Sequence, residues 1–214
     1  MDIDYVVGTK RFEQHEERTN KTSSGKKNSK DDRDVTIYSL TKFLHLSSQC
    51  NPNIIEVFFA PKNCILYINE YGQKLLDNVK LFVSKVAYHR FSGYAYSQER
   101  KLLTKNPIGL RKEYIEKFGY DVKFSVHLIR LYYECIELLT SGRITLPHVQ
   151  RRFLLNIKQG KVALSEILEE AKRLKELTDK AYVESKLRYS ADHEKINNLQ
   201  KEMLLSFWRE KGQL

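Results

Sequence analysis

Cysteine is scarce in this chain of 214 residues, and no long apolar run occurs in it. The three cysteines (Cys50, Cys64 and Cys135) are an odd number at spacings unlike those of zinc motifs, which predicts reduced thiols. Such cysteine use is typical of a cytoplasmic protein. No stretch approaches the roughly 18 apolar residues of a membrane span, and the first residues lack the pattern of a signal peptide.

Several catalytic signatures are also missing. The chain has no P-loop, no dinucleotide-binding glycine motif and no Ser-His-Asp signature. The histidines outside the central helical region follow no metal-ligand pattern: His15, His45, His89, His148 and His193. These absences argue against the enzyme classes that those motifs mark.

Basic residues are in excess. The chain has 37 Lys and Arg against 27 Asp and Glu, a formal charge of +10. This balance favours polyanionic partners such as nucleotides or RNA; the alternative is that the charge serves only solubility. A hydrophobic content of 41% is enough to build a core for one medium domain, or for a small α/β core with a helical partner.

The first third of the chain predicts strands around a polar segment. Residues 2–7 alternate in the manner of a strand, and residues 34–38 (DVTIY) form a second β-rich run. Between them, residues 14–33 are polar and predict a mobile loop. Ser39 is suited to cap a helix, and the apolar run after Asn51-Pro52-Asn53, IIEVFFAP, has the length of a buried strand.

The remainder of the chain predicts helices. Apolar residues recur at helical spacing in 69–82, 85–103, 120–139, 164–186 and 192–211. The predicted class is therefore α+β: a small mixed sheet with a helix in residues 1–65, followed by a helical domain in residues 66–214.

Carboxylates lie in both of the apolar runs predicted as strands 2–7 and 54–61. Asp2 and Asp4 point to the same face of a strand, where they repel each other unless a cation such as Mg²⁺ or Mn²⁺ holds them. Glu56 is the one charge in IIEVFF, and a neighbouring strand would bring it to the Asp pair. The three predict a metal site. The alternatives are a solvated Asp pair, and a Glu56 paired with Arg or Lys.

A cationic stripe runs along the helix predicted at 120–139. Lys123, His127, Arg130 and Glu134 are 4, 3 and 4 residues apart and share one face of an otherwise apolar helix. Facing a cleft, this stripe would bind nucleotide phosphates. The alternative is a wet helix face with an internal Arg130–Glu134 pair. Upstream, Lys101 lies in a basic and aromatic stretch that could contact a nucleic acid.

Six segments, taken in order, resemble one family. They are DIDYVVG, DVTIYSLTKFLHL, NPNIIEVFFAP, YHRFSGYAYSQ, YDVKFSVHLIRLYYECIELLTSGRI and RRFLLNIKQGKVALSEILEEAK. Together they are similar to the nucleotidyltransferases of the polymerase β superfamily that are associated with RNA repair in bacteria and phages. The resemblance implies that residues 1–65 form a nucleotidyltransferase core.

The resemblance also implies an activity. Such enzymes transfer a nucleoside monophosphate from an NTP to a hydroxyl by two-metal catalysis, here with RNA or tRNA as the expected acceptor. Asp2 and Asp4 match the catalytic metal-binding pair and Glu56 the third carboxylate.

Further positions match the family's YD-x-K-x-x-x-H-x-x-R helix. They are Asp121, Lys123, His127 and Arg130, which we expect to bind substrate together with Lys101.

The family pattern is incomplete at one point. A Gly-Ser element precedes the Asp pair in this superfamily, whereas only Met1 precedes Asp2 in this sequence. A fragment, a late start or a degenerate relative would each account for this. The alternative function is accordingly a catalytically inactive nucleotide- or RNA-binding module.

Overall fold

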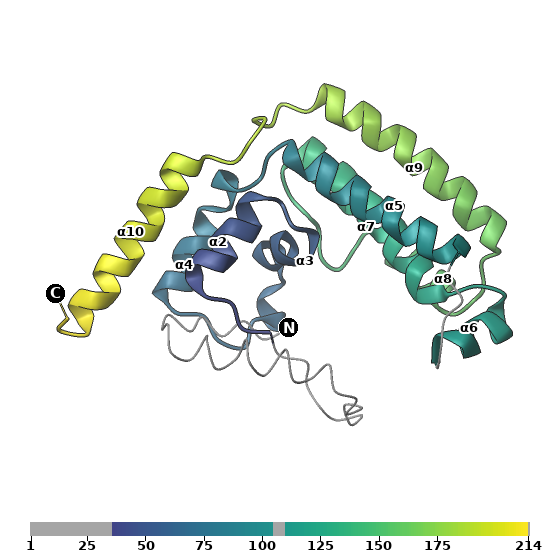
Figure 1. Ribbon diagram of the computed structural model, residues 1–214, viewed down its shortest axis with the longest axis horizontal. Coiled ribbons are helices and arrows are strands. Elements are labelled where there is room, and N and C mark those ends of the chain that lie inside the picture. Colours follow the sequence, from purple (N-terminus) through teal and green to yellow (C-terminus); the bar gives the residue numbers. More distant parts are fainter. Residues whose placement is uncertain (1–35, 105–109, 214) are drawn as a thin grey trace.

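The computed structural model describes residues 36–104 and 110–213, and every regular element within them is a helix (Figure 1). The elements are α2 (Leu40–Ser48), α3 (Pro52–Ile55), η1 (Glu56–Phe59), η2 (Lys62–Cys64), α4 (Glu70–Asp77), η3 (Val79–Leu81), α5 (Val86–Thr104), α6 (Leu110–Phe118), α7 (Val122–Ser141), α8 (Arg151–Lys158), α9 (Leu164–Glu184) and α10 (His193–Glu210). The predicted α+β class with a small mixed sheet is wrong, because these residues contain no strand. The predicted strand at 2–7 and the predicted loop at 14–33 lie outside the described residues.

The first six residues of IIEVFFAP are helical, contrary to the prediction of a strand. Asn51 caps α3, its side chain accepting a hydrogen bond of 3.1 Å from the amide of Asn53, and Pro52 occupies the first turn. Ile54, Ile55 and Phe58 are buried, a spacing that suits a helix as well as a strand. Capping and proline chemistry therefore outweigh the β propensity of the apolar residues.

The helix predicted after Ser39 is confirmed as α2. The Ser39 hydroxyl accepts a bond of 3.3 Å from the amide of Lys42, and Leu40, Phe43 and Leu44 are buried. Residues 36–38, part of the second predicted strand, have no regular structure.

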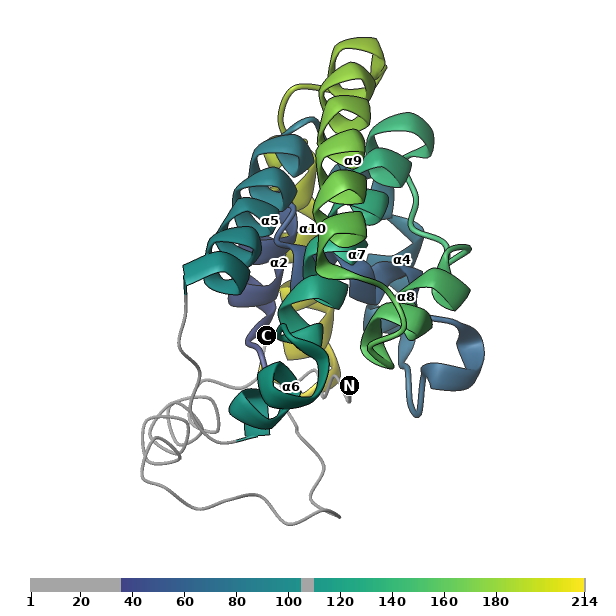
Figure 2. The same ribbon diagram turned by 90° about the vertical axis from the view of Figure 1, so that its right-hand side faces the viewer.

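Helix α7 forms the centre of the molecule. It packs against α5, α9 and α8, and Figure 2 shows α5, α7 and α9 running side by side. Leu128, Ile129 and Leu131 of α7 are fully buried, so the helix has core contacts around most of its circumference. It ends at Ser141, and the next residue, Gly142, has a φ of 71° in the left-handed region that glycine adopts without strain.

Helix α10 packs at the other end of the molecule, beside α2 and η3. The amide of Asp192 donates a bond of 2.9 Å to the carbonyl of Leu81, and the Gln200 amide donates one of 2.8 Å to the Thr41 hydroxyl. These contacts attach the C-terminal helix to the segment that precedes α5.

Buried side chains from both halves of the described chain form one hydrophobic cluster. Cys50 and Cys135 are buried free thiols, and Cys64 is an exposed one. Among the helices described, none combines the length and apolar character needed to cross a membrane. The domain boundary near residue 65 stays a prediction.

Candidate functional site: a cationic pocket beside a carboxylate cluster

A pocket of about 480 Å³ lies between α5, the first half of α7 and the end of α8. Its lining comprises Tyr94, Gln98 and Lys101 from α5, Val122, Lys123, Phe124, Val126, His127 and Arg130 from α7, and Lys158 from α8. We refer to it as the cationic pocket. Helical spacing accounts for the α7 contribution, because Lys123, His127 and Arg130 lie on one face of this helix.

Four cations line this pocket, and no acidic side chain is among its described lining residues. The Lys101 ammonium lies 6.0 Å from the ring centre of Phe124, and that of Lys123 lies 5.7 Å from the ring centre of Tyr114 on α6. These ring contacts leave the charges of both lysines available. The charge of this pocket suits an anion with several charges, such as a phosphate chain.

His127 is the neutral member of the pocket. Burial, followed by the charges of Arg130 and Lys101, lowers the pKa of His127 from 6.5 to about 4. Its ring meets that of Tyr94 edge to face at 4.8 Å, and its Nδ1 lies 3.2 Å from Nη2 of Arg130. Arginine can only donate, so Nδ1 accepts and Nε2 carries the proton. His127 thus offers the pocket a hydrogen-bond donor without a charge.

Arg130 connects the cationic pocket to two carboxylates. Its Nη1 lies 3.7 Å from Oε1 of Glu56, and its Nε lies 3.3 Å from Oε1 of Glu134. Glu134 is fully buried, whereas Arg130 and Glu56 keep about a quarter of their side chains exposed (27% and 24%). The Arg130–Glu134 pair considered from the sequence is thereby confirmed, but Glu134 does not lie on a wet helix face.

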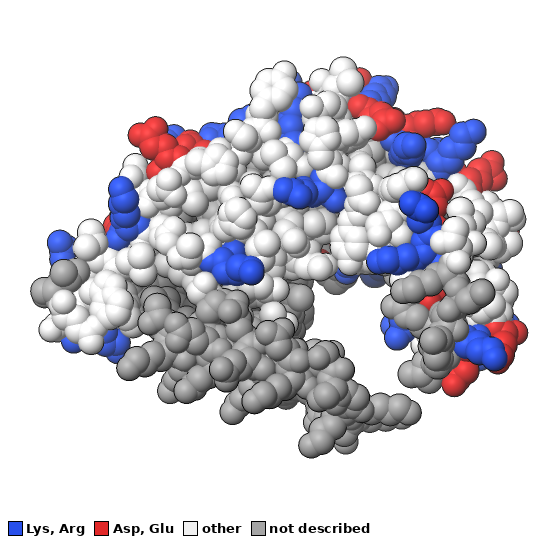
Figure 3. Space-filling model, in the orientation of Figure 1, with Lys and Arg blue, Asp and Glu red and all other residues white. Residues whose placement is uncertain are grey.

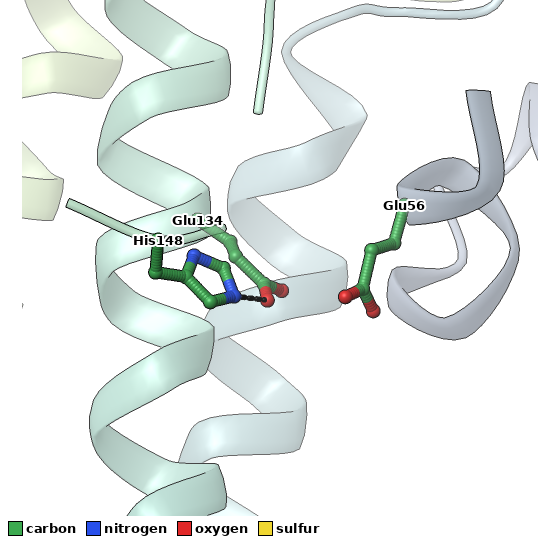
Figure 4. A group of neighbouring side chains, drawn as sticks. All are labelled: Glu56, Glu134 and His148. Carbon is green, nitrogen blue, oxygen red and sulfur yellow. Dashed lines mark ion pairs between the residues drawn. The ribbon is translucent and has the colours of Figure 1, made fainter. Parts of the chain in front are cut away.

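Glu56, Glu134 and His148 form a carboxylate–histidine cluster, shown in Figure 4. One potential ligand atom from each lies within 4.8 Å of the others, and Nε2 of His148 is 3.2 Å from Oε1 of Glu134. Burial and the Glu134 charge raise the pKa of Glu56, and the charges of Arg130 and His148 oppose this shift. The three side chains come from η1, α7 and the segment between α7 and α8.

Asp121 acts as the N-cap of α7. Its carboxylate accepts bonds of 2.9 and 3.2 Å from the amides of Lys123 and Phe124, and the residue is only 2% exposed. This contact positions the start of the helix that carries the pocket. A direct role of Asp121 in substrate binding stays a prediction.

The structure brings four predicted substrate-binding residues into one pocket: Lys101, Lys123, His127 and Arg130. Glu56 instead faces Arg130 and the cluster, in agreement with the pairing that was the alternative for this residue. The predicted ligands Asp2 and Asp4 lie outside the described residues. Their metal role stays a prediction.

Sequence reasoning missed two contributors. Lys158 reaches the pocket from α8, and its position in the last turn of an amphipathic helix gives no signal of this. His148 joins Glu134 through a contact between segments 14 positions apart, for which no sequence pattern exists.

Charge is distributed unevenly over the surface. On the face shown in Figure 3, Lys and Arg side chains lie both in the middle and along the rim, whereas Asp and Glu side chains lie mainly along the rim. Such a face suits a negatively charged partner better than a basic one.

One family model, described as the RNA repair pathway DNA polymerase beta family, matches residues 12–206. The match includes every residue of the cationic pocket and of the carboxylate–histidine cluster, and it begins after Asp2 and Asp4. No curated protein and no solved structure matches the chain. Because the match extends over most of its length, the chain belongs to the RNA repair pathway DNA polymerase beta family.

Proposed function

We propose that the protein transfers a nucleoside monophosphate from an NTP to a hydroxyl group of RNA, tRNA included, releasing pyrophosphate. The observation that carries this proposal is the cationic pocket, where Lys101, Lys123, Arg130 and Lys158 surround a space without an acidic lining residue in the described chain. A triphosphate has the charge and length to engage several of these groups together. Family membership supports this reaction class.

The pocket residues act on the phosphates. Lys101 and Lys123 neutralise phosphate oxygens as point charges, and Arg130 offers a planar set of donors. His127 donates from Nε2 without adding charge. Charge that develops on the leaving pyrophosphate is thereby met by groups already in position, which is the most effective form of electrostatic catalysis.

Two divalent metal ions are the expected cofactors, with Asp2 and Asp4 as the proposed ligands. When bound, they would lower the pKa of the acceptor hydroxyl and neutralise the triphosphate. Glu56 is already paired with Arg130. The role of Glu56 as the third carboxylate of this centre stays a prediction.

The test is transfer of label from each α-³²P-NTP to RNA oligonucleotides in the presence of Mg²⁺. We expect label on an RNA that ends in a free 3′-hydroxyl, and we expect Asp4→Asn to abolish it without a change in the circular dichroism spectrum. Lys123→Ala should weaken NTP binding. Lys112→Ala is the matched control, because Lys112 is a 69% exposed lysine of α6 outside the pocket.

Three results would contradict the proposal or a part of it. Binding of NTPs without transfer to any acceptor would identify an inactive binding module. Full activity of Asp4→Asn would remove the metal assignment. Transfer to a small molecule or protein hydroxyl, with RNA untouched, would keep the chemistry and overturn the acceptor.

A further inference from the structure

The carboxylate–histidine cluster contacts the pocket residue Arg130, shares no residue with the pocket lining, and uses neither Asp2 nor Asp4. It brings together side chains from a 3₁₀ helix, a long helix and a connecting segment, and it places their ligand atoms within 4.8 Å of one another (Figure 4). Glu56 and Glu134 face each other across this space. Two carboxylates at such a distance repel unless a positive charge lies between them.

Glu134 provides an independent observation. Its side chain is fully buried, and neither of its carboxylate oxygens makes a hydrogen bond within the described structure. Its neighbours Arg130 and His148 are at ion-pair distance, but neither meets hydrogen-bond geometry, and Nε of Arg130 is likewise buried without a hydrogen bond. A buried carboxylate without hydrogen bonds is costly, and coordination of a metal ion is one of the few arrangements that offset this cost.

The charges in the cluster do not balance. One guanidinium faces two carboxylates, at 3.7 Å from Glu56 and 3.3 Å from Glu134. The imidazole of His148 supplies a positive charge only when it is protonated. With His148 neutral, one negative charge is left uncompensated.

We propose that Glu56, Glu134 and His148 bind a divalent transition-metal ion such as Zn²⁺ or Mn²⁺. One imidazole nitrogen and two carboxylates are a donor set that these ions accept, with further positions left for water. Mg²⁺ prefers oxygen ligands alone, which makes the imidazole the selective element. The site uses neither Asp2 nor Asp4, so that this proposal and the proposed catalytic function can fail independently.

Arg130 couples this site to the cationic pocket. An ion between the carboxylates takes over their neutralisation, and the guanidinium becomes free to bind an anion in the pocket. The coupling is reciprocal, since an anion that engages Arg130 leaves the carboxylates to the metal. The metal therefore raises the affinity of the pocket for anions.

Isothermal titration with Zn²⁺ tests the site. The protein used for this titration carries three substitutions, Asp2→Asn, Asp4→Asn and Cys64→Ser. They remove the proposed catalytic ligands and the exposed thiol, so that neither can bind the ion. We expect one equivalent of Zn²⁺ to bind, and His148→Ala or Glu56→Gln to weaken it at least about tenfold. Both side chains are partly exposed (13% and 24%), so these substitutions are milder than any at the fully buried Glu134. His45→Ala is the control, an exposed histidine outside the cluster.

Two further measurements test the coupling between the sites and the role of His148 as a metal ligand. Pyrophosphate should bind several-fold more tightly with Zn²⁺ present, and this gain should vanish in His148→Ala. The ¹⁵N resonances of His148, assigned by substitution, should shift on addition of Zn²⁺. Absence of Zn²⁺ binding, equal affinity in His148→Ala and the unsubstituted protein, or unmoved His148 resonances would each overturn the site.

Discussion

Arg130 is shared by the cationic pocket, where its charge is available to an anion, and by two carboxylates, whose charge it neutralises. On one side it lines the cationic pocket, and on the other it neutralises Glu56 and Glu134. Lysine has the same charge but a single point of contact, so Arg130→Lys would have to give up one of these partners. The geometry of the guanidinium, more than its charge, thus determines how the pocket and the carboxylates share one residue.

At His127 the low pKa predicts a dependence of stability on pH. The folded-state pKa of about 4 lies below the ordinary value of 6.5, so the unfolded chain binds more protons between these values. The free energy of unfolding therefore falls as the pH is lowered from about 6.5 to 4, and solvent screening of this partly exposed ring keeps the loss below the roughly 3 kcal/mol that the whole shift represents. Urea unfolding of the protein and of His127→Gln, at intervals from pH 4 to 7, measures this contribution.

Other acidic groups also titrate in this range, and the variant separates them from His127. We expect the curve of His127→Gln to fall less steeply with decreasing pH than that of the unsubstituted protein. Parallel curves would show that His127 is protonated as readily in the folded protein as in the unfolded chain. The donor role proposed for a neutral imidazole would then be lost.

At the scale of the elements, one glycine connects α8 to α6. Gly160 follows α8 with φ of 68°, and a Cβ at this position would lie 2.0 Å from Cδ1 of Phe118 in α6. We expect Gly160→Ala to lower the free energy of unfolding by roughly 2 kcal/mol more than Gly212→Ala does, because overpacking adds to the cost of the left-handed backbone. Gly212 is a matched control, since its φ is 64° and its Cβ would meet nothing within 4 Å.

Urea unfolding of the two variants measures this difference. The same displacement should reach the pocket, because Tyr114 of α6 lies beside the Lys123 ammonium and Lys158 is in the last turn of α8. Equal losses in both variants would mean that α6 does not pack on this turn in solution.

The helices could be read from the sequence where their signals are local. Asp121 and Gly142 mark the start and end of α7, and Ser39 marks the start of α2, because capping depends only on residues within one turn. The prediction of a strand for IIEVFFAP is wrong, because local helix signals of the same kind precede this run. Asn51 and Pro52 are a cap and a first-turn residue, and these local signals outweigh the apolar length of the run, which is typical of a strand.

The candidate site likewise has one part that could be predicted from local sequence and one part that could not. Lys123, His127 and Arg130 share a helix face at a spacing that the sequence displays, and they do line one pocket. The contacts of Arg130 with Glu56 and of Glu134 with His148 depend on how separate segments pack. No local pattern encodes such contacts, so the cluster became apparent only in three dimensions.

For the molecule as a whole, the excess of basic residues can promote RNA binding in two ways: through the net charge of the whole surface, or through the cations of one pocket. A formal charge of +10 attracts any polyanion, whichever surface it meets. The cationic pocket concentrates four of these charges on α5, α7 and α8. The two effects differ in what happens when a single lysine is removed at different places.

Salt dependence of RNA binding distinguishes the two. For single strands, the logarithm of the affinity falls with the logarithm of salt concentration by about 0.7 for each phosphate neutralised. We expect Lys123→Ala and Lys158→Ala each to lower this slope by roughly that amount, measured by fluorescence anisotropy of a short single-stranded RNA between about 50 and 200 mM KCl. Lys112→Ala removes the same charge from α6, where Lys112 lies 3.6 Å from Glu116 outside the pocket.

If net charge alone governed binding, the three variants would be indistinguishable, because each lowers the charge by one. If the pocket receives the RNA, Lys112→Ala should keep the slope of the unsubstituted protein, and the double variant Lys123→Ala/Lys158→Ala should lose about twice as much as either single one. A slope that is unchanged in both pocket variants would place the RNA elsewhere on the surface and leave the pocket to the NTP alone.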